Sequence, residues 1–393
     1  MAAATNDIPI DVRPGIEFGT LSSLSSRSLL RREVAAGGPQ WLPAVFVFGS
    51  IAAVAYADFI VSSVSLGYLY ILPLGISAIF LRTQISYALI AVCVFFHDLF
   101  GPPYPSLQAR ITHNFTAVVG FTFVVYVIQR YVTQREQLDS TVRQQRDQLL
   151  LDVELAAQVQ RMFLPIHRPS VPGLEIAGMM HPARGVSGDY YNYTAIDEHT
   201  LQIVIADVAG KGVPAALLMS ATAAAVQLEA REERDMLEMV NRLNSSLHSL
   251  SDSSRYVTLL LADIDARRRS LRYVNCGHNP ALLFQAETHE VIPMSSSCFP
   301  IGMFDSEACA INSANLSSGD VLVLYTDGVT EARDSRGEEF GMERLSNLIR
   351  HGHTLSADGL MNHVLESVRD FSRDVGFDDD ATILVVKFNF ASM

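Results

Sequence analysis

Hydrophobic and polar positions divide the chain into two parts of different character. Between residues 41 and 129 uncharged apolar runs dominate, and the only charged side chains are Asp58, Arg82, Asp98 and Arg110. From residue 130 onward apolar, polar and charged residues alternate as they do in a water-soluble protein. The pattern predicts a helical membrane part followed by a soluble part.

The apolar runs are long enough to cross a bilayer, since about 20 apolar residues in a helix span the hydrocarbon. We expect about four spans, at 41–60, 65–82, 84–100 and 112–130. Arginines precede the first span, lie in the second connection and follow the fourth span. This distribution predicts that both termini are cytoplasmic.

Asp58, at the end of the first expected span, has two interpretations. Charged residues inside membranes are often ligands or proton-transfer groups. A charge at the end of a span can also lie at the interface, in contact with water. We expect the second arrangement for Asp58.

The segment from 130 to 163 has no glycine or proline and is rich in strong helix formers, which predicts one helix. Its apolar residues recur at a spacing of three and four, with a stutter: Leu138, Val142, Leu149, Val153, Ala156 and Phe163. This is typical of a two-stranded coiled coil, which makes a homodimer the expected assembly. The alternative is a single amphipathic helix packed on its own domain.

The soluble part mixes predicted strands and helices. Runs rich in β-branched and aromatic residues predict strands at 174–180, 201–207, 256–264, 270–275, 281–285, 320–326 and 382–388. Helices are expected at 214–231, 235–251, 341–350 and 357–373. Strands that follow strands, with helices inserted in pairs, predict an α+β fold with antiparallel sheets flanked by helices.

Charge and cysteine content exclude some classes of function. The net charge of −13 and the pI near 5.3 argue against nucleic acid as a partner, because phosphate binding needs clustered lysine and arginine. The four cysteines show no CxxC pair and no zinc spacing. We therefore expect reduced cysteines in a cytoplasmic soluble part.

Acidic residues stand at the ends of several predicted elements: Asp189, Asp207, Asp327 and the run 378–380. Asp207, in "IADVAGKGVPAALLM", has three possible roles: a helix cap, part of a phosphate-binding glycine loop, or a metal ligand. The loop lacks the GxxxxGK[ST] pattern, which disfavours nucleotide binding. Several acids brought together at strand ends would suit Mg²⁺ or Mn²⁺.

Several motifs together resemble a known family. "PARGVSGDYYNY", "IADVAGKGVPAALLMS", "LRYVNCGHNPALL", "LYTDGVTEARDSRGEEFG" and "DDATILVV" occur in that order. They resemble the bacterial metal-dependent protein phosphatases related to protein phosphatase 2C, in the branch of SpoIIE and the Rsb phosphatases. The resemblance covers about 165–388 and implies a helix–sheet–sheet–helix sandwich.

The resemblance also implies two Mn²⁺ or Mg²⁺ ions and their ligands. Asp207 matches the acid that bridges both ions, and the backbone carbonyl of Val208 matches a ligand of the second. Asp189 matches an outer or water-mediated acid, and Asp327 and Asp379 match further ligands, with Asp379 favoured over Asp380. In this scheme Asp207 and Asp327 are the catalytic acids.

Other positions near these motifs have alternative roles or differ from the family pattern. Arg184 is a candidate for binding substrate phosphate, or else a structural residue. Asn192 stands where the family often has aspartate, which would loosen a hydrogen bond to a metal-bound water. Ser187 replaces a common glycine, and we expect no consequence. Glu331 and the turn "CGHNP", with Asn275 and His278, are expected to support the fold.

The predicted organisation is a cytoplasmic tail (1–38), a transmembrane domain (39–130), a linking helix (131–164) and a phosphatase-like domain (165–393). The resemblance implies a multi-pass protein of the bacterial inner membrane whose cytoplasmic domain dephosphorylates serine or threonine. It also implies a STAS-type anti-sigma-factor antagonist as substrate. The alternatives are a catalytically inactive scaffold and, less favoured, a transporter with a regulatory domain.

Overall fold

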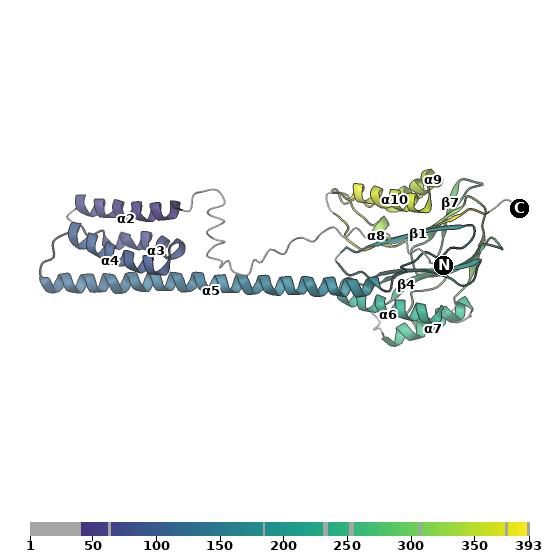
Figure 1. Ribbon diagram of the computed structural model, residues 1–393, viewed down its shortest axis with the longest axis horizontal. Coiled ribbons are helices and arrows are strands. Elements are labelled where there is room, and N and C mark those ends of the chain that lie inside the picture. Colours follow the sequence, from purple (N-terminus) through teal and green to yellow (C-terminus); the bar gives the residue numbers. More distant parts are fainter. Residues whose placement is uncertain are drawn as a thin grey trace, which may run out of the picture. The chain divides into compact units, whose positions relative to one another are not determined.

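The computed structural model describes residues 41–61, 64–183, 185–230, 235–250, 255–305, 309–373 and 376–390. The described residues form two compact units that divide between Gln148 and Leu149. The first unit is helical, and the second combines two sheets with helices (Figure 1). A helical part followed by an α+β part is the order that the hydrophobic pattern predicts.

The helical unit contains α2 (Leu42–Ile60), η1 (Gly67–Tyr70), α3 (Ile71–Phe80), α4 (Thr83–Phe100) and the beginning of α5 (Leu107–Arg161). Among the described residues, α2, α4 and α5 are long and apolar enough to cross a membrane. The predicted span at 65–82 corresponds to a shorter apolar helix, Gly67–Phe80. Helices therefore occupy all four predicted spans. Among the described residues, three of these helices are long and apolar enough to cross a membrane.

Apolar side chains line both the inside and the outside of the helical unit. Val47, Leu74 and Val125 are completely buried between the helices, whereas Phe46 and Phe123 are exposed on its outer surface. A helix that is apolar on all sides is either deeply buried in protein or surrounded by lipid. The exposed phenylalanines are therefore consistent with a membrane environment.

The expectation that Asp58 lies in water at the interface is wrong. Its side chain is completely buried, and its two oxygens accept hydrogen bonds from the Leu66 amide and the His97 ring. Hydropathy placed this residue at the end of a span, but it could not show that the side chain turns inward toward other polar groups.

Helix α5 continues through the predicted linking segment as far as Arg161. Leu138, Val142 and Leu149, three residues of the predicted coiled-coil pattern, are exposed in the single chain. At the end of the helix Ala157 is buried against Val186 and Ala216, which belong to the second unit as Ala157 does. The last turns of the helix are thus part of the soluble unit, and the coiled coil upstream stays a prediction.

The soluble unit contains two five-stranded antiparallel sheets. The strands are β1 (Leu174–His181), β2 (Asp189–Ala195), β3 (Thr200–Val208), β4 (Val257–Asp265), β5 (Ser270–Cys276), β6 (Ala281–Gln285), β7 (Glu290–Met294), β8 (Asn312–Asn315), β9 (Val321–Tyr325) and β10 (Ala381–Phe388). Their order is β1-β10-β9-β6-β7 in one sheet and β2-β3-β4-β5-β8 in the other. All the predicted strands are present.

Helices cover the outer face of each sheet (Figure 1). The helices are α6 (Val213–Glu229), α7 (Met236–Leu250), α8 (Asp327–Thr330), α9 (Gly341–Gly352) and α10 (Ala357–Phe371). Helices α9 and α10 pack on the sheet that contains β1 and β10. Helices α6 and α7 share an apolar cluster with the sheet that contains β2 and β3. A third cluster lies between the sheets and includes Ile203, Ile205 and Leu384. The unit is the helix–sheet–sheet–helix sandwich that the family resemblance implies.

Three strands escape prediction from the sequence, namely β2, β7 and β8. Strand β7 contains Pro293, and β8 reads "NSAN", so both have low β-propensity. Both are edge strands, where short and polar sequences are common. Strand β2 begins with Asp189 and contains Asn192, which hides its tyrosine-rich β pattern.

The expectation of reduced cysteines is not met throughout. Cys298 and Cys309 form a disulfide, whereas Cys93 and Cys276 are free and buried. The two bonded residues are eleven positions apart, and the fold brings their Cα atoms within 5.0 Å of each other. Spacing along the chain could not reveal this approach.

Candidate active site

The predicted acids lie at strand ends that belong to both sheets. Asp189 begins β2 and is the direct partner of Asp207 in the antiparallel ladder with β3. In the other sheet, Asp327 follows β9 and begins α8, and Asp379 lies just before β10. The chain reaches the same end of the sandwich four times and places a carboxylate there each time.

Two buried hydroxyl groups join the sheets through Asp189. Thr326 Oγ1 and Thr382 Oγ1 donate hydrogen bonds to the same oxygen of Asp189, Oδ2, at 2.7 and 2.6 Å. Thr326 also receives a hydrogen bond from the Thr382 amide at 2.9 Å. The carboxylate is therefore fixed between β2 and the β9–β10 pair. Sequence reasoning missed these threonines, although they adjoin the acids in "YTDG" and "DDAT".

Burial and mutual repulsion shift the titration of these acids. Burial raises the pKa of Asp207 to about 7, and the charges of Asp327, Asp379 and Asp380 add to that effect. Burial also raises the pKa of Asp189, with a further contribution from Asp207. For Asp327 the pKa is again raised, first by burial and then by Asp379. The carboxylates raise one another's pKa because they lie close together.

Asp379 and Asp380 have different environments. The two oxygens of Asp380 accept hydrogen bonds from the amides of Ala183 and Gly188, both at 2.7 Å. Asp380 therefore holds the segment that leads into β2. By contrast, Asp379 Oδ2 lies 2.6 Å from Lys211 Nζ, in an ion pair that is partly exposed. Of the two, Asp379 is the one whose carboxylate an incoming cation can reach.

The glycine loop after β3 is a backbone turn. Gly210 and Gly212 have φ angles of 108° and 75°, which only glycine adopts readily. Gly212 is the N-cap residue of α6, and Pro214 lies in the first turn. Asp207 is therefore not the cap of this helix, and that alternative is excluded.

Val208, whose carbonyl was expected to be a ligand, lies near the end of the acid-bearing strand. Its side chain is buried, and its carbonyl oxygen is 3.4 Å from the position that a Cβ on Gly188 would occupy. Gly188 directly precedes Asp189, so the carbonyl faces the same segment as the acids.

The glycine of the "DG" pair permits a close approach between the two strand ends. A Cβ atom at Gly328 would lie 2.1 Å from the carbonyl oxygen of Asp380. Real Cβ atoms do not come so near to backbone. Any side chain at this position would therefore separate Asp327 from the Asp379–Asp380 segment.

Ser187 has a structural role that the sequence did not reveal, so our expectation of no consequence is wrong. Its hydroxyl accepts a hydrogen bond from the Asp189 amide at 3.0 Å. Gln160, in the last turn of α5, donates to the Ser187 carbonyl at 2.6 Å and accepts from the Ser187 amide at 2.9 Å. The end of α5 is thereby tied to the segment two residues before an acid of the site.

Asn192 does not have the role expected from the family pattern. Its side-chain oxygen accepts a hydrogen bond from the Tyr193 amide at 2.9 Å. Because side chains alternate along a strand, Asn192 lies on the face opposite that of Asp189. The replacement of aspartate by asparagine therefore does not loosen a contact at the acids.

The turn "CGHNP" supports the fold, as predicted. Asn275 accepts a hydrogen bond from the His278 amide at 2.8 Å and donates to its carbonyl at 3.1 Å. The ring nitrogen Nδ1 of His278 lies 2.8 Å from the Thr258 hydroxyl, and Thr258 is the ladder partner of Asp207. Burial lowers the pKa of His278 to about 4, so the ring is neutral at pH 7.

Arg184, the candidate substrate contact, lies outside the described residues.

The donor set fits hard divalent cations. Mg²⁺ and Mn²⁺ prefer carboxylate, carbonyl and water oxygens, and the site offers four carboxylates and the Val208 carbonyl. Burial and then the neighbouring carboxylates raise the pKa of Asp207, so negative charge on this group is unfavourable in the metal-free protein. A bound cation would relieve that repulsion.

Comparisons with known proteins find similarity to phosphatases. The family model described as Stage II sporulation protein E (SpoIIE) matches residues 197–389. The chain is 28% identical to the phosphoserine phosphatase RsbU of Bacillus subtilis (strain 168) over 286 residues, which is 72% of this chain and 82% of RsbU. It is 32% identical to the phosphoserine phosphatase RsbP of the same organism over 186 residues, 46% of this chain and 45% of RsbP.

Solved structures show the same fold. The SiaA-PP2C domain of Pseudomonas aeruginosa superposes with a TM-score of 0.56 at 23% identity and covers 63% of this chain and 98% of that domain. The PP2C domain of SpoIIE from Bacillus subtilis with a fragment of its regulatory domain gives a TM-score of 0.51 at 22% identity, covering 56% of this chain and 64% of that structure. The chain therefore contains a SpoIIE/PP2C-type phosphatase domain, and its relatives RsbU and RsbP are phosphatases of the SpoIIE/Rsb branch.

Proposed function

We propose that the chain is a membrane-anchored, metal-dependent protein-serine/threonine phosphatase. The observation that carries this proposal is the convergence of Asp189, Asp207, Asp327 and Asp379 from two sheets. Hydrolysis assisted by metal ions uses an activated water, so it needs no cysteine or serine nucleophile.

In this proposal the acids and one carbonyl hold two Mn²⁺ or Mg²⁺ ions. Asp207 and the Val208 carbonyl, with Asp327 and Asp379, would supply the direct ligands, and Asp189 the outer one. When bound, such ions would lower the pKa of a water molecule and would neutralise charge on a phosphoryl group. The protein's own task is to keep the acids in place.

Residues around the acids perform that task. Thr326 and Thr382 hold Asp189 by hydrogen bonds to its ionised form. Asp380 fixes the segment before β2 through two amides. Lys211, now paired with Asp379, carries a positive charge at the rim, where it can attract a phosphate group. Arg184 remains the predicted substrate contact.

The proposed substrate is a small phosphorylated protein, an anti-sigma-factor antagonist of the STAS type. The support is the similarity to RsbU and RsbP, which are named phosphoserine phosphatases. The chain spans less than half of RsbP, so this step rests mainly on the likeness to RsbU.

Membrane anchoring and dimerisation complete the proposal. Three of the described helices are long and apolar enough to cross a bilayer, and the arginine distribution favours a soluble unit on the cytoplasmic side. The exposed residues Leu138, Val142 and Leu149 would form the seam of a parallel homodimer. In this arrangement the membrane part regulates the phosphatase through α5.

The test uses the full chain in lipid nanodiscs and a phosphoserine protein as substrate. We expect phosphate release that requires Mn²⁺ or Mg²⁺. Asp207→Ala and Asp327→Ala should each lower kcat/KM at least about 100-fold, because loss of even an outer-shell partner of a metal costs roughly 10–100-fold. Glu287→Gln, at an exposed acid outside the site, is the matched control and should be unchanged. Absence of metal-dependent release would favour the inactive-scaffold alternative.

A further inference from the structure

A second cluster of polar side chains lies inside the helical unit, at the ends of three helices. Asp58 is near the end of α2, His97 near the end of α4, and His113 near the beginning of α5. Asp58 is completely buried, and His97 is 4% exposed. None of these residues belongs to the phosphatase site.

Asp58 fixes the orientation of the His97 ring. Its Oδ2 lies 2.9 Å from His97 Nδ1, and its Oδ1 accepts a hydrogen bond from the Leu66 amide at 2.9 Å. The carboxylate therefore holds the proton of His97 on Nδ1, which leaves Nε2 with a lone pair in the neutral ring. Gly67 lets the backbone approach the ring closely, since a Cβ there would lie 2.7 Å from His97 Cε1.

The other ring nitrogen of His97, Nε2, faces a second imidazole. His97 Nε2 and His113 Nε2 are 3.1 Å apart. Two imidazoles that bind one tetrahedral Zn²⁺ at 2.0–2.1 Å have their nitrogen atoms about 3.3 Å apart. The two rings therefore need to separate by only a few tenths of an ångström to bind one ion.

Two residues that carry hydroxyl groups lie near the two rings. Ser65 Oγ lies 3.4 Å from His97 Nε2. The ring of Tyr104 is 5.4 Å from that of His113, and its buried hydroxyl has no hydrogen-bond partner among the residues that the structure describes. A buried hydroxyl without a partner is costly, and a cation would supply one.

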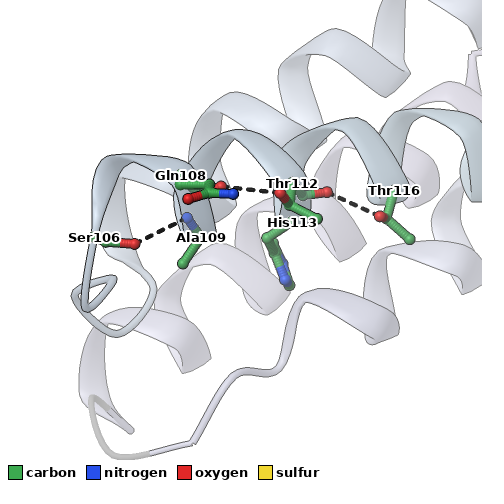
Figure 2. Close-up of a pocket in the computed structure, with 6 residues that line it drawn as sticks. All are labelled: Ser106, Gln108, Ala109, Thr112, His113 and Thr116. Atoms are coloured by element: carbon green, nitrogen blue, oxygen red, sulfur yellow. Dashed lines mark hydrogen bonds between the residues drawn. The ribbon is translucent and has the colours of Figure 1, made fainter.

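His113 also opens the cluster to the surface. It lines a depression with Ser106, Gln108 and Thr112 (Figure 2). Figure 2 shows the imidazole pointing away from the axis of α5, beside the polar side chains of the same helix. An ion could therefore reach His113 through a polar surface.

We propose that His97 and His113 bind one divalent transition-metal ion such as Zn²⁺, with an oxygen ligand from Ser65 or Tyr104. Imidazole nitrogen is a preferred ligand for this class of metal. A metal-bound histidine nearly always donates its other ring N–H to a carboxylate or carbonyl. Asp58 and His97 form that pair, so Asp58 acts as a positioning residue.

The experiment titrates the full chain, in nanodiscs of phosphatidylethanolamine and phosphatidylglycerol, with Co²⁺ as a coloured substitute for Zn²⁺. Tetrahedral Co²⁺ absorbs visible light much more strongly than the octahedral Co²⁺ that is typical of an all-oxygen site, because a tetrahedral site has no centre of symmetry. We expect one equivalent of such absorption, lost on addition of Zn²⁺. The band should persist in Asp207→Ala, which separates this site from the phosphatase site.

Substitutions test the assignment of each residue. His113→Gln, at an exposed position of α5 where misfolding is not expected, should abolish the band. Asp58→Asn should weaken binding about 10–100-fold, as loss of an outer-shell partner does. His167→Gln, an exposed histidine outside the cluster, should bind as the unchanged chain does. A band that survives His113→Gln, or no band in the unchanged chain, would mean that the two rings share only a hydrogen bond, and the proposal would be wrong.

Discussion

The two units of this protein both bury carboxylates, but they do so in different ways. Asp58, in the helical unit, has an imidazole and an amide as partners. Asp207, in the soluble unit, has Asp327, Asp379 and Asp380 as its charged neighbours. Burying a carboxylate costs little when donors surround it and much when other carboxylates do. The arrangement at Asp58 orients a neighbouring ring. The arrangement at Asp207 brings together carboxylates whose charge bound cations can neutralise.

The sharpest test of this contrast compares two adjacent acids. Asp379→Asn should lower phosphatase activity about 100-fold with little loss of stability, because it removes a proposed metal ligand and part of the repulsion. Asp380→Asn should lower the free energy of unfolding by about 1–3 kcal/mol, since it weakens two hydrogen bonds to a partly buried segment. Activity assays and urea titrations of both variants would decide. Equal loss of activity with equal stability would argue against separate roles.

The pH dependence of metal binding should reveal the repulsion at Asp207. Its pKa is about 7 in the folded chain, raised by burial and then by Asp327. The metal-free folded state therefore binds a proton more tightly than the unfolded chain does, and it loses stability as pH rises from about 4 to 7. Metal ions require the ionised carboxylate, so Mn²⁺ affinity should rise about tenfold per pH unit below 7 and level off above it.

Calorimetric titration of the full chain with Mn²⁺ between pH 5.5 and 8.5 measures this directly. The metal-free protein should also melt at a lower temperature at pH 8 than at pH 5.5. An Mn²⁺ affinity that stays constant from pH 5.5 to 7.5 would show that Asp207 is ionised over that whole range. The pKa of Asp207 would then lie below 5.5, and the expected effect of burial and repulsion would be absent.

The smallest expected effect concerns the hydrogen bonds that Asp189 accepts. Thr382→Val removes one of two hydroxyl groups that bond to its Oδ2. The free energy of unfolding should fall by about 1–2 kcal/mol, the cost of leaving a buried acceptor with one donor fewer. Thr194→Val, in the same hairpin as Asp189 but partly exposed, is the control. If both variants were equally stable, the hydroxyl would not contribute to holding the acid.

Much of the soluble unit could be predicted, because β-branched runs and ordered motifs identify core strands and the acids that follow them. The edge strands β7 and β8 could not be predicted, since their polar sequences depend on neighbours for pairing. Motif spacing also missed Gln160, whose contact with Ser187 joins residues 27 positions apart.

The helical unit was less predictable. Hydropathy located the helices but could not show which way Asp58 points, so we expected it in water. The approach of His97 to His113 depends on the packing of α4 against α5, which no pattern in either helix reveals. The disulfide between Cys298 and Cys309 depends in the same way on how a loop folds back.

The pairing of Asp189 with Asp207 limits where this domain can gain or lose residues. Side chains alternate along β2 and β3, so one residue inserted within either strand would turn an acid to the other face of the sheet. The loop between Ala195 and Thr200 connects β2 to β3 and lies outside their hydrogen-bonded ladder. It can therefore change length without moving that pair. Relatives with a different number of residues between the two acids should therefore carry the change in this loop.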